Sequence, residues 1–280
     1  MNFPFYIARR YLFSKKKHNA INIISGISVC GVALATLALV CTLSVFNGFQ
    51  DMVASFFTAF DPQLKITVRE GKVFDAQDKR IRAVCALPEV EVFTETLEEN
   101  AMVQYKDRQA MVVLKGVEDN FEELTAIDSI LYGAGEFLLH DSIVNYGVMG
   151  VELVATLGTG LEFVDPLQVY LPKRNAKVNM ANPGASFNRD YLYSPGVVFV
   201  VNQQEYDGKY ILTSLDFLRE LLDYTTEVSA MELKLKPNVN ISSVQSKIEN
   251  ILGDDFVVQN RYQQQADVFR IMEIEKLISY

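Results

Sequence analysis

The side chains best suited to binding a partner gather in one turn-rich stretch, residues 173–195, between two predicted strands. Connections longer than about 12–15 residues are uncommon in compact domains and are usually functional or disordered. Aromatic and arginine side chains dominate binding hot spots because they bury a large area. We therefore predict a protruding binding loop with the contact residues Met180, Pro183, Phe187, Arg189, Tyr191 and Tyr193. The alternative is a surface excursion whose aromatic rings fold back on the domain.

Enzyme signatures are absent from the sequence. The only two histidines are His18 and His140, and no Gly-rich phosphate loop ending in Gly-Lys-Ser/Thr occurs. Neighbouring carboxylates such as Glu98 and Glu99 are expected on solvated surface, because adjacent residues point to different sides of an element. We expect no catalytic residue, no metal and no cofactor. The net charge of −9 also argues against nucleic acid as a partner, which requires a basic footprint.

Uneven charge along the chain predicts a membrane anchor. Five Lys and Arg residues and no acidic residue precede residue 19, and residues 19–50 carry no charged side chain. About 20 apolar residues span a bilayer as a helix, so residues 21–48 are long enough even when tilted. Lys and Arg clusters stay on the cytoplasmic side. We therefore predict a cytoplasmic N-terminus and an exported domain from about residue 49.

A core helix, a cleavable signal peptide and a lipoprotein signal all fit this apolar stretch less well. A core helix of a soluble domain would rarely stay uncharged over such a length beside a basic flank. A cleavable signal peptide has an apolar region of about 7–15 residues, whereas this one continues past a small-residue site at Ala35 to Phe46. A bacterial lipoprotein signal would require a small residue before Cys41, where Val40 stands. An uncleaved anchor remains.

Small residues follow one face of the predicted span. Spacings of three and four residues place them along a single helical stripe formed by Ser28, Gly31, Ala35, Ala38 and Thr42. Small residues let helices approach closely, and close packing drives helix association in lipid. The stripe predicts packing against other transmembrane helices, on a partner or on a further part of the chain. Chance is the alternative, since Ala and Ser are common in spanning helices.

Both ends of the chain predict amphipathic helices. In residues 1–20, apolar positions alternate with Arg9, Arg10 and Lys15, which suits a segment lying at the cytoplasmic lipid interface. Docking on a partner fits the same pattern. Residues 266–280 mix apolar and charged positions as expected for a helix returning to the membrane, and there the sequence ends.

The exported part predicts an α+β domain with a largely antiparallel sheet. Strands are expected at residues 63–69, 90–95, 101–105, 109–117, 167–171, 197–202, 210–213, 231–236 and 256–259. Helices are expected at residues 76–87, 120–127, 149–157, 214–222 and 242–252. Ser214 and Ser242 stand where helix caps are wanted, and Asp207-Gly208 predicts a hairpin turn. The only cysteine in this part is Cys85, which excludes an internal disulfide.

Short motifs in a fixed order resemble one protein family. They begin with Phe-Tyr-Ile-Ala-Arg-Arg-Tyr-Leu at residues 5–12 and Ile-Ser-Gly-Ile-Ser at residues 24–28. Leu-Ser-Val-Phe-Asn-Gly-Phe follows at residues 43–49, then Gly-Val-Glu-Leu-Val-Ala-Thr-Leu-Gly at residues 150–158 and Phe-Arg-Ile-Met-Glu-Ile-Glu-Lys at residues 269–276. These motifs resemble the lipoprotein-releasing (LolC/LolE-type) ABC transporter permeases of the FtsX/MacB-like superfamily.

The resemblance implies an architecture. It consists of a cytoplasmic amphipathic segment (residues 1–20), transmembrane helix 1 (residues 21–48) and a MacB-like periplasmic core domain (residues 49–265) with a ferredoxin-like porter part and an inserted sabre part. Residues 266–280 would lead to a second span, which this sequence does not reach. Residues 173–195 fall where such permeases carry a hook hairpin that recruits a periplasmic carrier.

The resemblance also implies a function in the inner membrane. The chain would be the permease subunit that releases a lipoprotein substrate from membrane lipid to a periplasmic lipoprotein carrier. A separate cytoplasmic ABC ATPase subunit would hydrolyse ATP, so the chain itself is not expected to be an enzyme. Its partner in the membrane would be a second permease copy or a paralogue. Two alternatives stay open: a MacB-like efflux permease working with an adaptor, and an FtsX-like regulator of a cell-wall hydrolase.

Overall fold

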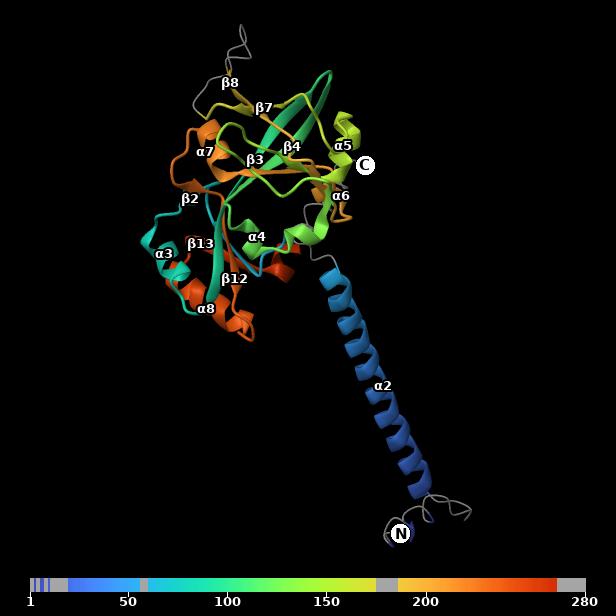
Figure 1. The fold of residues 1–280 in the computed structure, drawn as a ribbon. Helices are drawn as coiled ribbons and strands as arrows, with labels where there is room; N and C mark the ends of the chain where they lie inside the picture. Colours follow the sequence, from blue (N-terminus) through green and yellow to red (C-terminus); the bar gives the residue numbers. More distant parts are fainter. Residues whose placement is uncertain are drawn as a thin grey trace. The chain divides into compact units, whose positions relative to one another are not determined.

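A computed structural model describes Phe3, Tyr6, Ile7 and Arg10, together with residues 20–55, 60–174 and 186–265. The chain divides into two compact units, Met1–Phe56 and Phe57–Tyr280. Figure 1 shows the single long helix of the first unit and the mixed α/β domain of the second. The expected α+β class with one N-terminal apolar helix is therefore confirmed.

The first unit is built on α2, a helix of 36 residues from Ala20 to Ser55. Its stretch Ile23–Gly48 is long and apolar enough to cross a membrane, the only such stretch in the described parts of the chain. Thr36 and Thr42 donate their hydroxyl hydrogens to carbonyls one turn back, Val32 O and Ala38 O, at 2.8 and 2.9 Å. Polar groups satisfied inside the helix are what a lipid environment requires.

The second unit contains a four-stranded antiparallel sheet with two helices. The order along the chain is β1, α3, β3, β12, α8, β13, and the spatial order of the strands is β13-β1-β12-β3. This βαββαβ arrangement is the ferredoxin-like one. Its elements are β1 (Leu64–Val68), α3 (Lys79–Cys85), β3 (Val90–Tyr105), β12 (Ala230–Leu235), α8 (Ile241–Leu252) and β13 (Phe256–Asn260). We call residues 60–96 and 230–265 the ferredoxin-like lobe.

One face of this sheet forms a core with α3 and α8. Alternate residues of β1, Leu64 and Ile66, are fully buried and pack with Ile81 of α3 and Ile248 of α8. The period of two along the strand and of 3.6 along the helices brings these apolar side chains together. α8 is capped by Asn240, whose side chain accepts the Ser243 N–H at 3.1 Å. The expected cap at Ser242 is therefore wrong by two residues.

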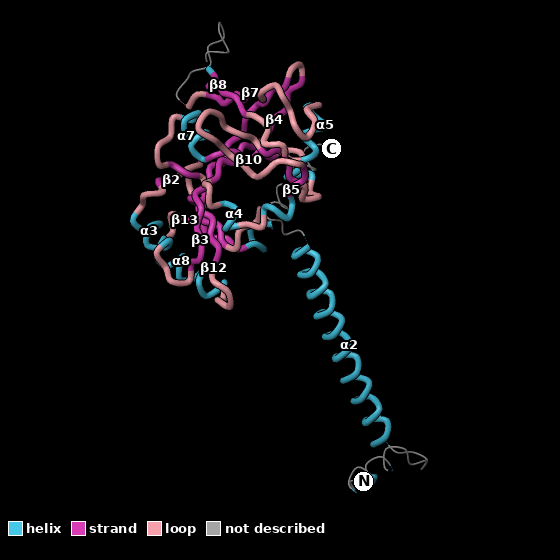
Figure 2. The backbone as a smooth tube through the Cα atoms, in the orientation of Figure 1, coloured by secondary structure: helices cyan, strands magenta, loops and turns pink. Residues whose placement is uncertain are grey.

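The inserted lobe, residues 97–229, begins within β3 and ends directly before β12. β3 pairs with β12 as far as Thr96 and with β4 from Thr96 onward, so both lobes share one strand (Figure 2). The sheet continues through β4 (Arg108–Val117), β10 (Tyr210–Ser214) and β6 (Val148–Met149), and also through β7 (Leu167–Pro172) and β8 (Phe187–Leu192). All pairs are antiparallel except β10 with β4.

Short elements complete the inserted lobe. They are α4 (Phe121–Leu124), the 3-10 helix η1 (Ile127–Ile130), α5 (Val151–Leu157), α6 (Gln204–Asp207) and α7 (Leu215–Leu222), with a small sheet made of β5 (Leu131–Gly133) and β9 (Val197–Phe199). A second small sheet pairs β2 (Phe74–Asp75) of the ferredoxin-like lobe with β11 (Glu227–Val228) of the inserted lobe. α5 and α7 cover one core of this lobe. A third cluster, around Phe60, Phe121 and Phe199, covers the other face where the two lobes meet.

Three further expectations about local structure are wrong. The expected strands 90–95 and 101–105 are one continuous strand, because β4 pairs with the residues between them. Asp207 ends helix α6, and the Gly208 N–H bonds Gln204 O at 2.9 Å, so this dipeptide is a helix end and not a hairpin turn. The end of the expected loop 173–195 is strand β8.

Candidate functional site

The β7–β8 hairpin turns one face to the core and one to solvent. On the inner face, Leu167, Val169, Leu171 and Leu192 are fully buried. Asn188 also points inward, and its Nδ2 donates to the Leu221 carbonyl at the end of α7 (2.6 Å). Because side chains alternate along a strand, Phe187, Arg189 and Tyr191 belong to the outer face.

Arg189 is held by aromatic rings on the outer face. It lies directly opposite Tyr170 in the β7–β8 ladder. Its guanidinium lies 5.8 Å from the ring centroid of Tyr170 and 5.1 Å from that of Tyr191, and it also donates a hydrogen bond to the Tyr191 hydroxyl. Cation–π contacts at such distances contribute about 0.5–1 kcal/mol at exposed sites. The arginine is thus oriented before any partner arrives.

The outer face extends across four strands. Met111, Met102, Tyr170 and Arg189 form one row, each opposite the next in the β4-β3-β7-β8 order. Met111 is 67% exposed, although methionine is an apolar residue. Phe187, at the start of β8, is 38% exposed. We call Met102, Met111, Tyr170, Phe187, Arg189 and Tyr191 the outer hairpin face.

The structure brings together part of the predicted binding loop. Arg189 and Tyr191 are in contact, and Phe187 precedes them on the same face of β8. Tyr193 follows the strand, is 36% exposed, and is tied through its backbone to Asn145 and Gly147. Met180 and Pro183 lie outside the described residues. Sequence reasoning missed Met102, Met111 and Tyr170, although strand alternation already placed them opposite the core-facing positions.

The small-residue stripe lies on the exposed surface of α2. Ser28, Gly31, Ala35, Ala38 and Thr42 are all exposed. A methyl group added at Gly31 would meet no heavy atom within 4 Å, its own helix backbone and chain neighbours aside. The described part of the chain therefore supplies no packing partner for this stripe.

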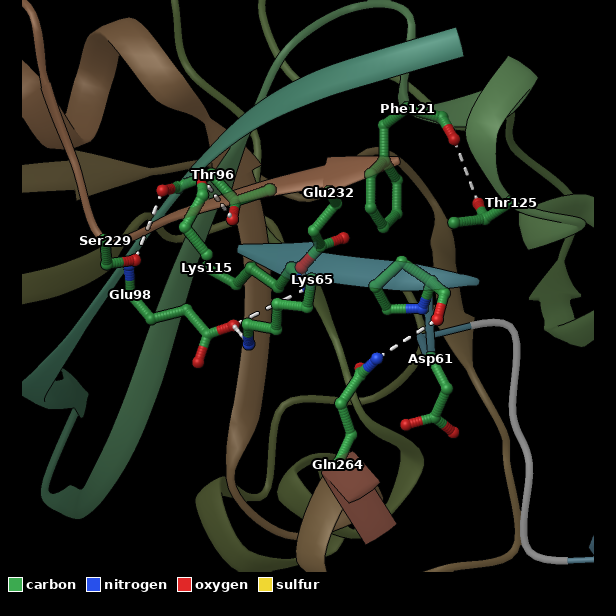
Figure 3. Close-up of polar contacts among 12 residues, drawn as sticks. Asp61, Lys65, Thr96, Glu98, Lys115, Phe121, Thr125, Ser229, Glu232 and Gln264 are labelled. Carbon is green, nitrogen blue, oxygen red and sulfur yellow. Dashed lines mark hydrogen bonds and ion pairs between the residues drawn. The ribbon is translucent and has the colours of Figure 1, made fainter. Parts of the chain in front are cut away.

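A second polar site lies where the two lobes meet, on the same face of β3 and β4 as Met102 and Met111 (Figure 3). Lys115 Nζ lies 2.6 Å from Glu232 Oε1, and both side chains are buried. Lys65 Nζ lies 3.3 Å from Glu98 Oε1, which is also 3.6 Å from Lys115 Nζ. The expectation that Glu98 lies on solvated surface is wrong, because Lys115 on the neighbouring strand β4 and Lys65 on β1, two strands away, compensate its charge in a half-buried position.

These charges control the ionisation of Glu98. Burial opposes its ionisation, but the positive charges of Lys65 and Lys115 outweigh burial and lower the pKa of Glu98 from 4.5 to about 2. Burial raises the pKa of Tyr210, whose hydroxyl donates to Glu98 Oε2 at 3.4 Å. Glu98 is therefore an acceptor that stays charged at neutral pH.

The same site joins the first and last described segments of the domain. The Asp61 carboxylate accepts hydrogen bonds from the Tyr206 hydroxyl at 3.2 Å and from Gln265 Nε2 at 3.0 Å. Arg261 Nε donates to the Asp61 carbonyl at 2.9 Å. A cavity of about 190 Å³ lies beside these groups, lined by Lys65, Glu98, Lys115, Tyr206, Tyr210 and Gln264, among others.

The described residues include no group of three His, Cys, Asp or Glu side chains placed to hold a metal ion.

The outer hairpin face and the site between the lobes offer different chemistry. The outer hairpin face offers exposed apolar and cationic groups to a macromolecular partner. The buried site offers ion pairs that fasten one lobe to the other.

Comparisons with known proteins agree on the kind of domain. The family model described as MacB-like periplasmic core domain matches residues 25–251, more than half of the chain. The lipoprotein-releasing system transmembrane protein LolC of Xylella fastidiosa is 22% identical over 97% of this chain and 63% of its own length. The corresponding LolE of Haemophilus influenzae is 22% identical over 100% of this chain and 66% of its own length. The chain thus spans just under two thirds of these relatives.

Solved structures give more distant likenesses. The periplasmic region of MacB from Actinobacillus actinomycetemcomitans is 11% identical over 73% of this chain and 91% of its own, with a TM-score of 0.48. The extracellular domain of the noncanonic ABC-type transporter YknZ from Gram-positive bacteria is 10% identical over 70% of this chain and 99% of its own, with a TM-score of 0.47.

Proposed function

Because the chain belongs to the MacB-like periplasmic core domain family, we propose that it is the permease subunit of an ABC transporter that releases lipoproteins from the inner membrane to a periplasmic carrier. The observation that carries this proposal is the outer hairpin face, where the exposed side chains of Met111 and Phe187 share a face with a pre-oriented arginine. The names of the LolC and LolE relatives support lipoproteins as the substrate class.

The proposed topology follows from the charge asymmetry. The basic N-terminal segment lies in the cytoplasm, α2 crosses the inner membrane, and the α/β domain lies in the periplasm. ATP hydrolysis then belongs to a separate cytoplasmic ATPase subunit, and this chain acts mechanically. The stripe from Ser28 to Thr42 faces a helix of a second permease copy or paralogue, or a further helix of the permease itself.

The outer hairpin face is suited to a protein partner. Arginine, tyrosine and methionine are enriched at protein interfaces, and arginine and tyrosine are enriched at hot spots. Side chains already held in place lose less conformational freedom on binding, which favours affinity. Arg189, held between Tyr170 and Tyr191, meets this condition. Within the proposed function, this face and the residues beyond it toward Met180 and Pro183 receive the carrier.

Site-specific photocrosslinking in intact bacteria tests the proposal. A photoreactive amino acid replaces Phe187, which is 38% exposed on the outer face. The matched control places it at Asn250, an exposed position on α8 of the ferredoxin-like lobe. We expect a crosslink to a soluble periplasmic lipoprotein carrier from position 187 and none from position 250.

The identity of the crosslinked protein separates the alternatives. A periplasmic adaptor at position 187 would indicate an efflux permease, and a cell-wall hydrolase would indicate a regulatory protein. Either result, or a carrier captured equally well at both positions, would contradict the proposed role of the outer hairpin face.

A further inference from the structure

The two shortest ion pairs between the lobes join residues that are not opposite each other in the strand pairing. In the β1–β12 ladder Lys65 lies directly opposite Glu232, and in the β3–β4 ladder Glu98 lies directly opposite Lys115. The two shortest ion pairs do not follow the ladders, whereas a longer one of 3.6 Å, between Lys115 Nζ and Glu98 Oε1, does. Lys65 binds Glu98 at 3.3 Å, and Lys115 binds Glu232 at 2.6 Å. Each lysine thus binds the carboxylate that stands opposite the other lysine.

This crossed pairing fastens one lobe to the other. Lys65 and Glu232 belong to the ferredoxin-like lobe, and Glu98 and Lys115 to the inserted lobe. The two shortest ion pairs therefore cross the boundary between lobes, beside Thr96, where β3 passes from β12 to β4. The direct pairing would instead place each ion pair inside one lobe.

The direct pairing is within reach of the same side chains. Residues directly opposite in an antiparallel ladder have Cβ atoms about 4.5–5.5 Å apart, which the long lysine and glutamate side chains bridge. Glu98 Oε1 already lies 3.6 Å from Lys115 Nζ. Both pairings hold two positive and two negative charges, so neither leaves a net charge uncompensated.

Two features of the site favour an exchange. Glu232 Oε2 is buried and has no hydrogen-bond partner among the described residues in the crossed pairing, a costly condition that the Lys65 ammonium would relieve in the direct pairing. The cavity of about 190 Å³ beside Lys65, Glu98 and Lys115 gives the side chains room to move. A densely packed core would not permit this.

We propose that these four residues form a charge-exchange latch, in which the crossed pairing locks the two lobes together and the direct pairing releases them to change their mutual angle. The ion pair between Arg219 Nη2 and Glu95 Oε2 (2.7 Å) joins the lobes on the other face of the sheet and takes no part in the exchange. It keeps the lobes attached in both states. The latch operates whichever partner binds the outer hairpin face.

Two charge-swapped double variants separate the states. Lys115→Glu with Glu232→Lys keeps an attractive crossed pair but places like charges opposite each other in both ladders, so it permits only the locked state. Lys65→Glu with Glu232→Lys keeps an attractive direct pair but makes both crossed pairs repulsive, so it permits only the released state. Both variants have the composition of the native chain.

The distance between the lobes reports the state. Spin labels are attached at Asp107→Cys in the inserted lobe and at Asn250→Cys in the ferredoxin-like lobe, two exposed positions. The native Cys30, Cys41 and Cys85 are replaced by Ala, and the full chain is reconstituted in nanodiscs. We expect the Lys115/Glu232 variant to keep the main native distance in a narrower distribution. In the Lys65/Glu232 variant we expect a second distance, minor or absent in the native chain, to become the main population.

A matched control reverses an ion pair inside one lobe. Lys209 Nζ and Glu205 Oε2 lie 2.9 Å apart on the inserted lobe, and Lys209→Glu with Glu205→Lys should leave the native distance unchanged. Identical distances in the two latch variants would overturn the proposal. So would loss of fold in the Lys65/Glu232 variant alone, because the direct pairing would then not be a folded state.

If position 232 accepts no lysine in either variant, the same test moves to Glu98, whose side chain is 22% exposed. Lys65→Glu with Glu98→Lys permits only the crossed pairing, and Lys115→Glu with Glu98→Lys permits only the direct one. The expected distances are those given above for the corresponding state. Unfolding of all four variants would also overturn the latch, since a site that tolerates no exchanged charge is a fixed structural pair.

Discussion

Lys115 Nζ lies 2.6 Å from Glu232 Oε1, with the two side chains 3% and 0% exposed. Removing one partner from a buried pair strands the other charge, which costs about 3–5 kcal/mol. Replacing both partners with apolar groups of similar volume is often neutral. The pair is therefore expected to add little net stability, provided that both charges are present or both are absent.

A variant that loses one charge of this pair should be less stable than a variant that loses both. We expect Glu232→Leu to lower the free energy of unfolding by about 3 kcal/mol and the melting temperature by roughly 6–12 °C. The double variant Lys115→Met with Glu232→Leu should melt close to the native chain. Differential scanning fluorimetry of the purified chain measures both. A double variant as unstable as the single one would show that the charges themselves hold the domain together.

Glu98 should make stability depend on acid pH. Burial opposes its ionisation, yet Lys65 and Lys115 lower its pKa from 4.5 to about 2. A carboxylate with a lowered folded-state pKa binds protons more weakly in the folded state than in the unfolded one. Its contribution is therefore complete above about pH 4.5 and lost as the pH falls toward 2. Glu98→Gln should melt lower at pH 7 and lose less on acidification to pH 2.5. Parallel melting curves would contradict this.

The outer hairpin face should bind without stabilising the fold. Phe187→Ala and Arg189→Ala are expected to weaken carrier binding by about 1 kcal/mol or more, roughly fivefold in Kd, with little change in melting temperature. The matched control is Leu192→Ala on the inner face of the same strand, which is fully buried and should lower the melting temperature instead. Biolayer interferometry with the purified carrier measures affinity. Intact binding with a lowered melting temperature for Phe187→Ala would make the outer face merely structural.

The small-residue stripe should govern assembly in the membrane. Ala35→Leu adds bulk where helices are expected to touch and should reduce co-purification with the membrane partner. Ala33→Leu makes the same chemical change on the opposite side of α2, since two residues correspond to about 200° of helix. Both variants should insert equally well. Equal co-purification would contradict the role of the stripe.

The orientation of the chain in the membrane can be tested by labelling cysteine thiols with a membrane-impermeant reagent. Burial raises the pKa of Cys85 to about 11, so its thiol should react slowly with maleimide in the folded domain. Asp107→Cys places a thiol in the exposed β3–β4 turn. A membrane-impermeant maleimide added to intact spheroplasts should label position 107 rapidly, and Cys85 only after denaturation at the outer surface. Labelling of position 107 only after the membrane is permeabilised would reverse the proposed topology.

Local patterns were sufficient for several elements. The uncharged stretch that became part of α2 is a property of consecutive residues, so no tertiary contact was needed to predict it. Strands β1 and β7 follow from alternation against one buried face, and the Ser214 cap of α7 depends only on a bond to the Phe217 N–H three residues later. In each case the physical cause lies within one turn or one strand of the chain.

Strand β8 required the tertiary structure. Its inner face carries Asn188 where alternation would place an apolar residue, and this polar group is satisfied by the Leu221 carbonyl, 33 residues away. Because this hydrogen-bond partner is so distant in the sequence, Asn188 resembles a turn-forming residue when only its sequence neighbours are considered. The outer row from Met111 to Arg189 was hidden for a related reason, because it exists only when four strands are in register.

The buried ion pairs were decided by tertiary structure alone. Lys115 and Glu232 are 117 residues apart, and Lys65 and Glu98 are separated by 33. In the sequence each is an ordinary charged residue in a strand, and charged residues in strands usually face water. Only the strand order of the folded sheet brings the four onto one face, where the rings of Phe60 and Phe121 lie against Lys115. Burial then makes the ion pairing necessary, because a charged group removed from water is costly unless it is paired.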